Sequence, residues 1–376
     1  MRHVQSGLPV MLVVVFGVRG VLSAVAGQAS DESRQRRSPS FASQVLFRAG
    51  DRGYKCYRIP ALVRTKRGTI LALCEARKHG GSDSGDIDVA LRRSVDGGRT
   101  WTDMQIIADD GAHTMGNPCP VVDASNSVIW LPICRDNKRV LLMKSADDGK
   151  TWSEPIDITQ HVMDPTWHWV GTGPGHGIQL RTGRLIVPSW ADQTKRLGEI
   201  QFSYVFYSDD HGQTWTRGKA LDRNASDECE VVELPGGSLY MNMRSRQNKR
   251  RRAYATSKDG GQTWSVVKYD PHLPEPSCQG SVVRFTTAGG GGKNRVLLAT
   301  PANPAKRSHM TVRLSYDECR TWPVSKVVHT GSSAYCDLAV TSDSEILLLY
   351  EADSYTKIVL ARFNLEWLTD RKDHLP

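Results

Sequence analysis

Residues Ser94–Trp101 read S-V-D-G-G-R-T-W, one copy of the pattern S-x-D-x-G-x-T-W that decides the fold. Full copies of the pattern also occur at 145–152, 208–215 and 257–264. A fifth copy, at 315–322, has Cys319 in place of the glycine. Each copy has an aspartate that can accept backbone N–H bonds, a glycine suited to positive φ and a tryptophan that can anchor a turn. The pattern therefore predicts a series of similar hairpin turns, in which the aspartates are structural.

Short apolar runs rich in β-branched residues lie between these turns, as at 69–73, 185–187 and 345–350. They predict buried strands, and no long amphipathic helix competes with them. Successive copies start about 50 to 63 residues apart, the length of one four-stranded sheet with its loops. The chain is therefore predicted to be all-β, a six-bladed β-propeller with one blade that lacks the pattern. We expect a strand near 361–365 to close the ring with N-terminal residues.

The composition is that of a globular protein rich in turns, with 33 glycines, 18 prolines and a net charge of +9. A positive charge fits a nucleic acid, an anionic surface or an anionic substrate. The only dense basic run, Lys249–Arg252, is interpreted as a solvated loop, and no nucleic-acid partner is expected.

The N-terminus resembles a secretory signal, with a basic start, an apolar stretch at 8–18 and small residues before Gly27. We predict a signal peptide at 1–26, a disordered lead-in at 27–40 and one catalytic domain at 41–376. A short membrane anchor is the alternative, although the apolar stretch is short for a span of about 20 residues. The prediction is an exported protein, whether extracellular, periplasmic or lysosomal, without stable membrane insertion.

Eight cysteines occur, none in a C-x-x-C arrangement, which argues against a structural zinc site. Export would permit disulfides, and Cys119 with Cys134 is the first pair to test. The alternative is that the cysteines are small buried apolar residues.

Several short motifs outside the repeats resemble the exo-alpha-sialidase (neuraminidase) family over nearly the whole chain after residue 57. They are Y-R-I-P at 57–60, E-A-R at 75–77 with Asp83 six residues on, Asp227-Glu228, N-M-R at 242–244, Arg307, Tyr335 and L-Y-E at 349–351. Each motif is weak alone, but their order and spacing together are specific.

The resemblance implies that Arg58, Arg244 and Arg307 bind the carboxylate of a sialic acid. Guanidinium groups are planar forks that match carboxylate oxygens, which makes the implied role chemically sound. Glu351 is implied to pair with Arg58 and orient it. For each arginine, a surface ion pair remains the alternative.

The resemblance also implies that Tyr335 is the nucleophile and Glu228 its general base. A neutral tyrosine can approach an anomeric carbon that carries a carboxylate, whereas an acidic side chain would be repelled. A tyrosine packed in the core is the alternative for Tyr335.

Asp83 is implied to be the acid and base catalyst, in a glycine- and serine-rich loop that suits a mobile group. Asp86 and Asp88 compete for this role, but they alternate with apolar residues as strand positions do. Arg77 is expected to contact substrate hydroxyls or Asp83.

Two further residues are candidates for the substrate-binding site. Asn117 precedes a proline where many relatives have an aspartate, and we assign it to substrate binding. His176, in the turn G-P-G-H-G, is either a pocket residue or a surface residue.

These features predict an exo-alpha-sialidase that removes terminal α-linked sialic acids from glycoconjugates with retention, through a covalent tyrosyl intermediate. No cofactor or metal is expected, and a monomer is the simplest expectation. The alternatives are a trans-sialidase using the same site, a catalytically idle sialic-acid-binding lectin, and a propeller that only scaffolds protein partners.

Overall fold

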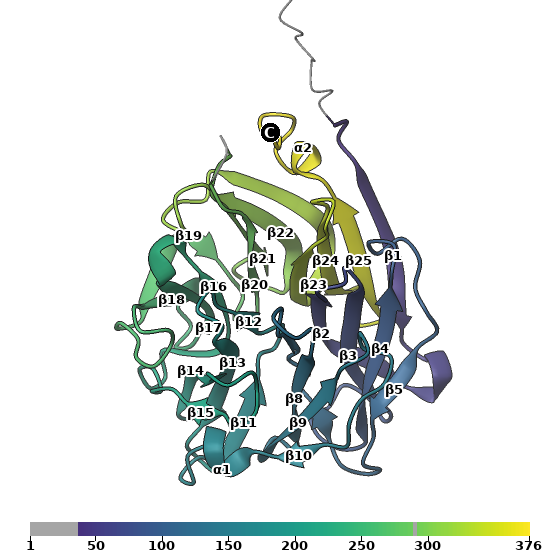
Figure 1. Cartoon of the computed structure of the whole chain (residues 1–376), viewed down its shortest axis with the longest axis vertical. Helices are drawn as coiled ribbons and strands as arrows, with labels where there is room; N and C mark the ends of the chain where they lie inside the picture. The colour runs from purple at the N-terminus through teal and green to yellow at the C-terminus, as the bar shows by residue number, and fades with distance from the viewer. Residues whose placement is uncertain (1–36, 289–291) are drawn as a thin grey trace, which may run out of the picture. The chain divides into compact units, whose positions relative to one another are not determined.

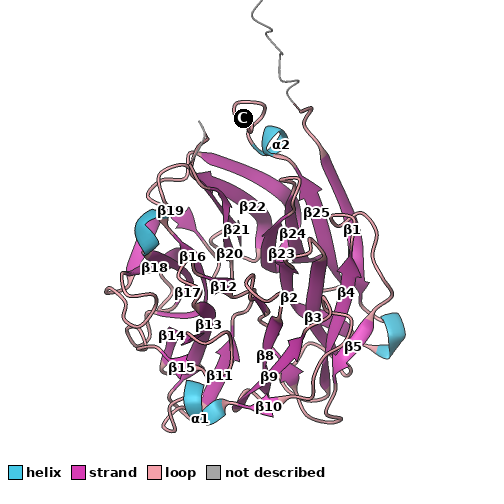
Figure 2. Cartoon of the chain, viewed as in Figure 1, coloured by secondary structure: helices cyan, strands magenta, loops and turns pink. Residues whose placement is uncertain are grey.

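The structure is a computed structural model, and it describes residues 37–288 and 292–376. The predicted signal peptide at 1–26 and residues 27–36 of the predicted lead-in lie outside this part of the chain. Residues Arg37–Pro376 form one compact unit, in which strands far outnumber helices and are connected by loops and turns (Figure 2). The all-β prediction is therefore confirmed.

The strands of the described residues form five antiparallel sheets (Figure 1). The first sheet contains β2 (Cys56–Arg64), β3 (Ile70–Arg77), β4 (Ile87–Ser94) and β5 (Gln105–Ala108). The second contains β6 (Met115–Gly116), β7 (Val121–Val122), β8 (Ile129–Arg135), β9 (Arg139–Ser145) and β10 (Ile156–Asp157). The third contains β11 (Trp169–Thr172), β12 (Ile178–Gln179), β13 (Leu185–Asp192), β14 (Gln201–Ser208) and β15 (Thr216–Arg217). The fourth contains β16 (Ser226–Glu233), β17 (Leu239–Ser245), β18 (Arg251–Ser257) and β19 (Lys268–Pro274).

The fifth sheet has seven strands in the order β1, β25, β24, β23, β22, β21, β20. These are β1 (Phe41–Arg48), β20 (Ser281–Thr286), β21 (Arg295–Pro301), β22 (Ser308–Ser315), β23 (Val324–Val340), β24 (Ile346–Ala352) and β25 (Lys357–Phe363). The long strand β23 pairs with β22 through residues 324–332 and with β24 through residues 333–340. Helices are short: α1 (Thr159–Val162), α2 (Leu365–Leu368), and the 3-10 turns Asp51–Gly53 and Pro235–Gly237.

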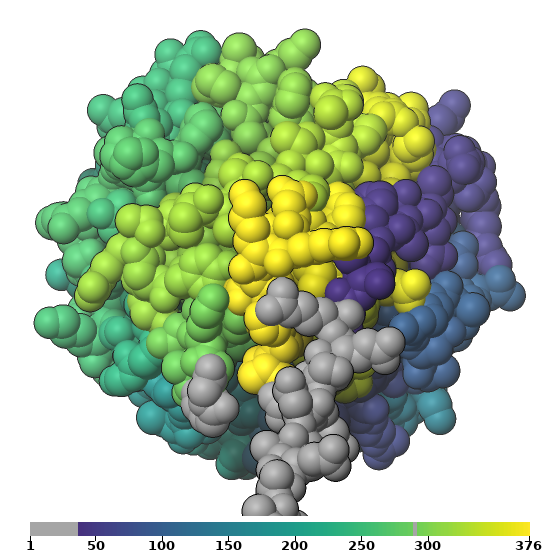
Figure 3. All heavy atoms as spheres, turned by 90° about the horizontal axis from the view of Figure 1, so that it is seen from above, coloured from purple at the N-terminus to yellow at the C-terminus, as the bar shows by residue number. Residues whose placement is uncertain are grey.

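The two ends of the described chain meet in one sheet. Strand β1 pairs antiparallel with β25 from Phe41↔Phe363 to Arg48↔Lys357. The N-terminal and C-terminal residues accordingly lie side by side in Figure 3. The expected C-terminal strand therefore exists, and its partner is the first described strand of the chain.

The repeated turns have the chemistry that the sequence predicts. In the first copy, Asp96 accepts hydrogen bonds from the backbone N–H groups of Arg99 and Thr100 and from the Thr100 hydroxyl. The Ser94 hydroxyl accepts the N–H of Gly98, whose φ is 84°. The threonine N–H and hydroxyl make the same contacts with Asp147, Asp210, Asp259 and Asp317, and the serine hydroxyl of each copy likewise accepts the N–H four residues on.

The strands β23, β24, β25 and β1 at one end of the seven-stranded sheet lack a repeated turn after β25, for a topological reason. Each turn joins a third strand to the fourth strand of the same hairpin, as β4 to β5 or β22 to β23. Beyond β25 the next strand is β1, which arrives from the other end of the chain. No hairpin turn exists there, so no copy of the pattern is needed.

Apolar side chains fill the space between neighbouring sheets. One core cluster joins β2 and β3 to β24 and β25, through residues such as Leu62, Ile70, Leu349 and Leu360, all at most 1% exposed. The first sheet is thus packed against the last one.

All eight cysteines are free and buried. The pair Cys119 and Cys134, proposed for a first disulfide test, forms no disulfide. Both thiols lie in an apolar cluster, so the interpretation as small buried residues is the correct one.

The interpretation of Lys249–Arg252 as a solvated loop is wrong for its last two residues, which begin β18. Lys249, Arg250 and Arg251 are exposed, but Arg252 lies in β18 with no exposed surface. Its guanidinium lies 3.4 Å from the buried carboxylate of Glu275. The four basic residues therefore differ in exposure, because the strand buries Arg252 and leaves the other three at the surface.

None of the helices in the described residues is long and apolar enough to cross a membrane.

Candidate active site

Tyr335 and Glu228 form the central contact of the site. Tyr335 lies in β23 and Glu228 in β16, and the tyrosine hydroxyl donates a hydrogen bond to the glutamate carboxylate. Burial, followed by the Glu228 carboxylate, raises the pKa of Tyr335 well above its ordinary value. The tyrosine is therefore a neutral hydroxyl held against a carboxylate that can take its proton.

The structure brings Arg58, Arg244 and Arg307 together around this pair. The guanidinium carbons of Arg58 and Arg307 each lie 5.3 Å from the centroid of the Tyr335 ring. Nη1 of Arg244 lies 3.1 Å from the Tyr335 hydroxyl oxygen and 2.9 Å from a Glu228 oxygen. The three cations come from β2, β17 and the residue before β22, so only the fold makes them neighbours.

Glu351, fully buried in β24, forms hydrogen bonds with residues of both β2 and β23. Its carboxylate accepts a hydrogen bond from Nε of Arg58 at 2.7 Å and from the backbone N–H groups of Ile59 and Tyr335 at 2.9 and 3.1 Å. Ile59 has a φ of 56°, a strained conformation for a β-branched residue. The Glu351 carboxylate thus orients Arg58 and holds the backbone at Ile59 and at Tyr335 in place.

Arg307 differs from the other two arginines in its partners. Its guanidinium donates to the Tyr355 hydroxyl at 3.3 Å and to the carbonyl of Ser277 at 3.1 Å. Arg58 and Arg244 have acidic partners, but none is within ion-pair distance of Arg307 in the described part of the chain. This half-buried cation is available to an anionic ligand.

Asp83 projects into the site from the loop that follows β3. Its carboxylate lies 2.8 Å from Arg77 and 3.9 Å from Arg58, and its side chain is 66% exposed. Arg77 also donates to the carbonyl oxygens of Gly81 and Ser82. Arg77 therefore holds the loop, and the exposed carboxylate at its tip can reach a bound molecule.

The two rival aspartates are engaged elsewhere. Asp88 is buried in β4, where its carboxylate accepts a hydrogen bond from the Tyr54 hydroxyl at 2.5 Å. Asp86 lies just before β4 and is 3.7 Å from Lys78. The strand interpretation is right for Asp88 and wrong by one residue for Asp86.

Asn117 supports the Asp83 loop through its neighbours. Its backbone N–H donates to Glu75 at 2.8 Å, and its side-chain amide donates to Asn137 at 3.0 Å. Asn137 in turn donates to the carbonyl oxygen of Asp83 at 3.2 Å. Sequence reasoning missed Asn137 and the role of Glu75, because neither contact is local in the chain.

A cavity of about 300 Å³ lies over these groups. Its lining includes the predicted residues Arg77, Asp83, Asn117, Glu228, Arg244 and Tyr335, and further residues such as Trp169, Trp190, Leu197, Gln201, Asp227 and Arg246. The two tryptophans give one wall an apolar face. Neither tryptophan belongs to a repeated turn, and only the fold brings the two together at the cavity.

Asp227 and Arg246 extend the charged wall of the cavity. The Asp227 carboxylate lies 3.2 Å from Arg246 and 3.6 Å from Arg244. Burial raises the pKa of Asp227 to about 6, although the two arginines oppose the shift. Arg246 follows Arg244 by two residues, and this strand period could have identified it.

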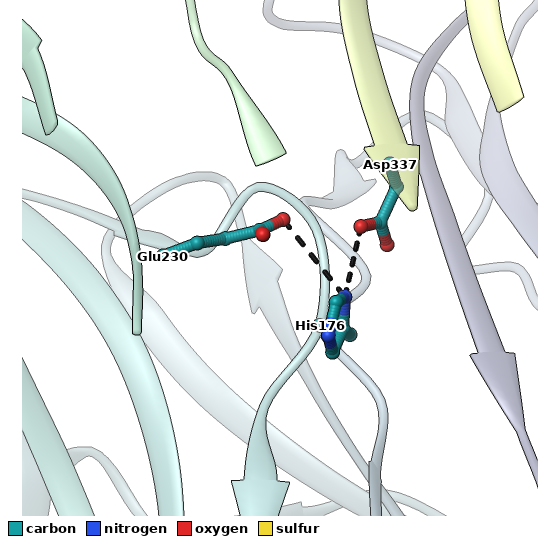
Figure 4. A group of neighbouring side chains, drawn as sticks. All are labelled: His176, Glu230 and Asp337. Carbon is teal, nitrogen blue, oxygen red and sulfur yellow. Dashed lines mark hydrogen bonds and ion pairs between the residues drawn. The ribbon is translucent and has the colours of Figure 1, made fainter. Parts of the chain in front are cut away.

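His176 fits neither of its two predicted positions, because it is buried and does not line the cavity. Its Nδ1 lies 2.8 Å from an Asp337 oxygen and 4.0 Å from a Glu230 oxygen (Figure 4). Asp337 already accepts hydrogen bonds from His176, Ser281 and the N–H groups of Leu62 and Leu338. That carboxylate therefore has little capacity left for a metal ion.

Residues 68–348, more than half of the chain, match the family model of the BNR repeat-like domain. The chain is 31% identical to the exo-alpha-sialidase of Aspergillus fumigatus, over 90% of this chain and 91% of that protein. It is 34% identical to the sialidase of Micromonospora viridifaciens, over 88% of this chain but 55% of that protein, so it spans about half of that relative.

Among solved structures, a Hadza microbial sialidase is similar, with a TM-score of 0.79 and 30% identity, over 87% of this chain and 69% of that chain. Family model, relatives and fold agree with the geometry around Tyr335. The chain therefore belongs to the exo-alpha-sialidase family of glycoside hydrolases.

Proposed function

We propose that this protein hydrolyses terminal α-ketosidically linked sialic acids with retention, through a covalent intermediate on Tyr335. The observation that carries the proposal is the convergence of three guanidinium groups on one tyrosine that contacts a carboxylate. An anionic sugar whose carboxylate sits on the reacting carbon needs both features at one place.

Arg58, Arg244 and Arg307 bind the substrate carboxylate. Arg307 supports this role most directly, because it has no acidic partner among the residues described. A bound carboxylate supplies the missing counter-charge and accepts the planar fork of the guanidinium group. Glu351 keeps Arg58 oriented for the same purpose.

In the first step, the Tyr335 oxygen attacks the anomeric carbon while Glu228 takes the hydroxyl proton. The bond from the anomeric carbon to the leaving oxygen breaks, and Asp83 donates a proton to that oxygen. In the second step, Asp83 takes a proton from water, which attacks the same carbon. The bond to Tyr335 then breaks, and Glu228 returns the proton. Two inversions at one carbon give net retention.

The contacts of the Asp83 loop support its role. Asp83 must exchange protons with the leaving group and then with water, so an exposed carboxylate on an anchored loop suits it. Arg77 at 2.8 Å and Asn137 at 3.2 Å supply the anchors, while the side chain stays 66% exposed.

The fold is proposed to be a six-bladed β-propeller. The division of β23 between β22 and β24 supports a reading of the seven-stranded sheet as two four-stranded blades. With the other four sheets these make six, and β1 closes the last blade through β25.

The remaining proposals concern the whole protein. Residues 1–26 form a signal peptide, 27–40 a lead-in and 41–376 the catalytic domain of an exported monomer. Its partners are sialylated glycoconjugates. These proposals rest on the sequence features given above.

Turnover of a fluorogenic sialoside tests the proposed mechanism. Tyr335→Phe should abolish turnover, and Asp83→Ala should lower kcat by about 10²–10⁴-fold, the usual contribution of a general acid. Asp86→Ala is the matched control, because this nearby acid is paired with Lys78 outside the cavity. Unchanged turnover in Tyr335→Phe would exclude the proposed nucleophile.

The products then separate hydrolysis from the alternatives. NMR should detect the α-anomer of free sialic acid as the first product. Sialic acid transferred to an added sugar, or to its own hydroxyl, would indicate a trans-sialidase. Binding without any turnover by the natural chain would indicate a lectin.

A further inference from the structure

A second pair of acids lies on the same two strands as the Tyr335–Glu228 pair. Glu230 follows Glu228 by two residues in β16, and Asp337 follows Tyr335 by two residues in β23. Side chains two residues apart on a strand point to the same side. The strands that meet through Tyr335 and Glu228 also meet through Asp337 and Glu230, whose nearest carboxylate oxygens lie within 4.8 Å of each other.

His176 completes this second contact. One nitrogen of His176 and one oxygen each of Glu230 and Asp337 all lie within 4.8 Å of one another, and the three side chains point together in Figure 4. Glu230 and Asp337 have no exposed surface, and His176 is 8% exposed. We call these three residues the buried triad.

Asp337 is the hydrogen-bond acceptor of the triad. Its two oxygens accept hydrogen bonds from the His176 ring, the Ser281 hydroxyl and two backbone N–H groups, at 2.6 to 2.9 Å. Four donors stabilise the charged form of a carboxylate, and the charge keeps a proton on Nδ1 of His176. The nearby Asp337 also raises the pKa of His176, against the effect of burial.

Glu230 is the neutral member. One of its oxygens accepts the N–H of Val282 at 2.8 Å, but Oε1, the one nearest His176, accepts no hydrogen bond from the residues that the structure describes. A protonated Oε1 explains this atom, because a carboxyl O–H can donate to the Asp337 carboxylate. Burial, followed by the Asp337 charge, raises the pKa of Glu230 well above its ordinary value.

The other titratable groups facing Glu230 are weak ones. They are the thiols of Cys119, Cys229 and Cys336, each kept neutral by burial, which raises the pKa of each. None of them supplies a positive charge that could compensate a second carboxylate. His176 is the member of the triad that can carry a positive charge, and its Nδ1 lies 2.8 Å from Asp337 but 4.0 Å from Glu230, so that charge compensates Asp337 first.

A bound metal ion is the other explanation for such a cluster, and the contacts disfavour it. A cation would require Asp337 to give up hydrogen bonds that it already makes. A Cβ at Gly175 would lie 1.7 Å from Oε1 of Glu230, so the backbone already closes one side of this oxygen. One shared proton satisfies the same atoms without any rearrangement.

We propose that the buried triad is a positioning device, in which a proton on Glu230 holds β16 against β23 and so sets Glu228 against Tyr335. This inference rests on the proposed function of that pair. Loss of the proton at alkaline pH places two buried carboxylates side by side. Their repulsion separates the strands and lowers kcat, whereas the arginines that bind substrate keep KM.

Glu230→Gln is the decisive variant, because its amide remains a neutral donor at every pH. We expect its kcat at the optimum to stay within about threefold of the natural chain, and its alkaline midpoint of kcat to rise by at least about one pH unit. Asp123→Asn is the matched control. It removes a buried carboxylate bound by a histidine at 2.8 Å, away from β16 and β23, and should leave the midpoint unchanged.

Infrared difference spectroscopy provides a second measurement on the unaltered chain, which holds even if Glu230→Gln fails to fold. A protonated carboxyl band should disappear with the same midpoint as kcat. An unshifted alkaline midpoint in Glu230→Gln, or a carboxyl midpoint that differs from that of kcat, would overturn the proposal. A stoichiometric metal in the purified chain, found by elemental analysis and lost in Glu230→Gln, would overturn it in favour of a cation site.

If the proposed function itself is wrong, the results will differ from those that overturn the role of the triad. In that case the natural chain would not turn over the sialoside at any pH, whereas the infrared titration would still report the state of Glu230.

Discussion

At the scale of single residues, Arg307 gives the clearest indication that the ligand is an anion. A half-buried cation without an acid partner is unfavourable unless something negative binds there. The fork of Arg307 is already held by Tyr355 and Ser277, so it is oriented before any ligand arrives. Orientation in advance reduces the entropy that binding must overcome.

We therefore predict that Arg307→Lys raises KM for a sialoside about 10- to 100-fold, because a lysine keeps the charge and loses the two-pronged contact. Steady-state kinetics with the fluorogenic sialoside measure the effect. Arg181→Lys serves as the control, since Arg181 forms an exposed pair with Glu233. An unchanged KM in Arg307→Lys would show that this arginine does not touch the substrate.

Asp227 yields a prediction about pH and stability. Burial raises its pKa to about 6 from 3.8, so the folded chain holds this proton more tightly than the unfolded chain. The contribution of this proton to the free energy of unfolding is fully present below about pH 4 and is lost as the pH rises through about 6. Asp227→Asn should remove this dependence, which is on the order of 3 kcal/mol.

Urea unfolding at pH 4 and pH 7 checks this prediction. The loss of unfolding free energy between the two values should be smaller in Asp227→Asn than in the natural chain. Equal losses in the two proteins would mean that Asp227 is already ionised at low pH.

At the scale of elements, three of the strands that carry the site have an irregularity in their pairing, a feature that several other strands share. The register shifts between Arg58 and Ala61 in β2, between Ser226 and Cys229 in β16, and between Ser333 and Cys336 in β23. Such bulges redirect side chains and increase local twist. Arg58, Glu228 and Tyr335 each lie at one of these shifts, so the strands bend where the site needs side chains turned inward.

The repeated turns also invite a test at this scale. Asp259 accepts hydrogen bonds from the N–H and hydroxyl of Thr263, and from Ser257. Asp259→Ala removes these acceptors and should lower the unfolding free energy by about 1–2 kcal/mol at neutral pH, with unchanged KM. Lys258→Ala, in the same turn, should have little effect.

The effect of Asp259→Ala on the free energy of unfolding should depend on pH. Desolvation opposes ionisation, but hydrogen bonds from Thr263 and Ser257 outweigh it and lower the pKa of Asp259. Its contribution is present at neutral pH and is lost as the pH falls through the folded-state pKa. The difference between Asp259→Ala and the natural chain should therefore narrow in acid, as thermal melts can show.

At the scale of the whole molecule, closure of the structure depends on β1. This strand covers β25 along its length, and Phe47 enters the core shared by the first and last sheets. Removal of β1 would expose a long edge strand and part of that core.

We predict that a chain beginning at residue 49 melts well below a chain beginning at residue 37, or does not fold. The control keeps β1 and the contact between Arg37 and the carbonyl of Asp343. Calorimetry of the two chains measures the difference. Equal melting temperatures would show that β1 is dispensable and that β25 tolerates a free edge.

Some features of this protein follow from short stretches of sequence alone. The turn pattern predicts its own hydrogen bonds, because aspartate, glycine and threonine act within five residues of one another. The all-β class follows from apolar runs between the turns. The motifs around Arg58, Glu228 and Tyr335 are likewise complete within a few residues, which made the family resemblance visible.

Other features required the tertiary structure. Arg58 meets Glu351 across 293 residues, and Tyr335 meets Glu228 across 107 residues, so no local pattern contains either contact. Free cysteines, the burial of Arg252 and the triad of His176, Glu230 and Asp337 depend on which sheets become neighbours. Periodicity along a chain specifies strands and turns, whereas burial and the charge states of acids are set by the groups that folding brings around them.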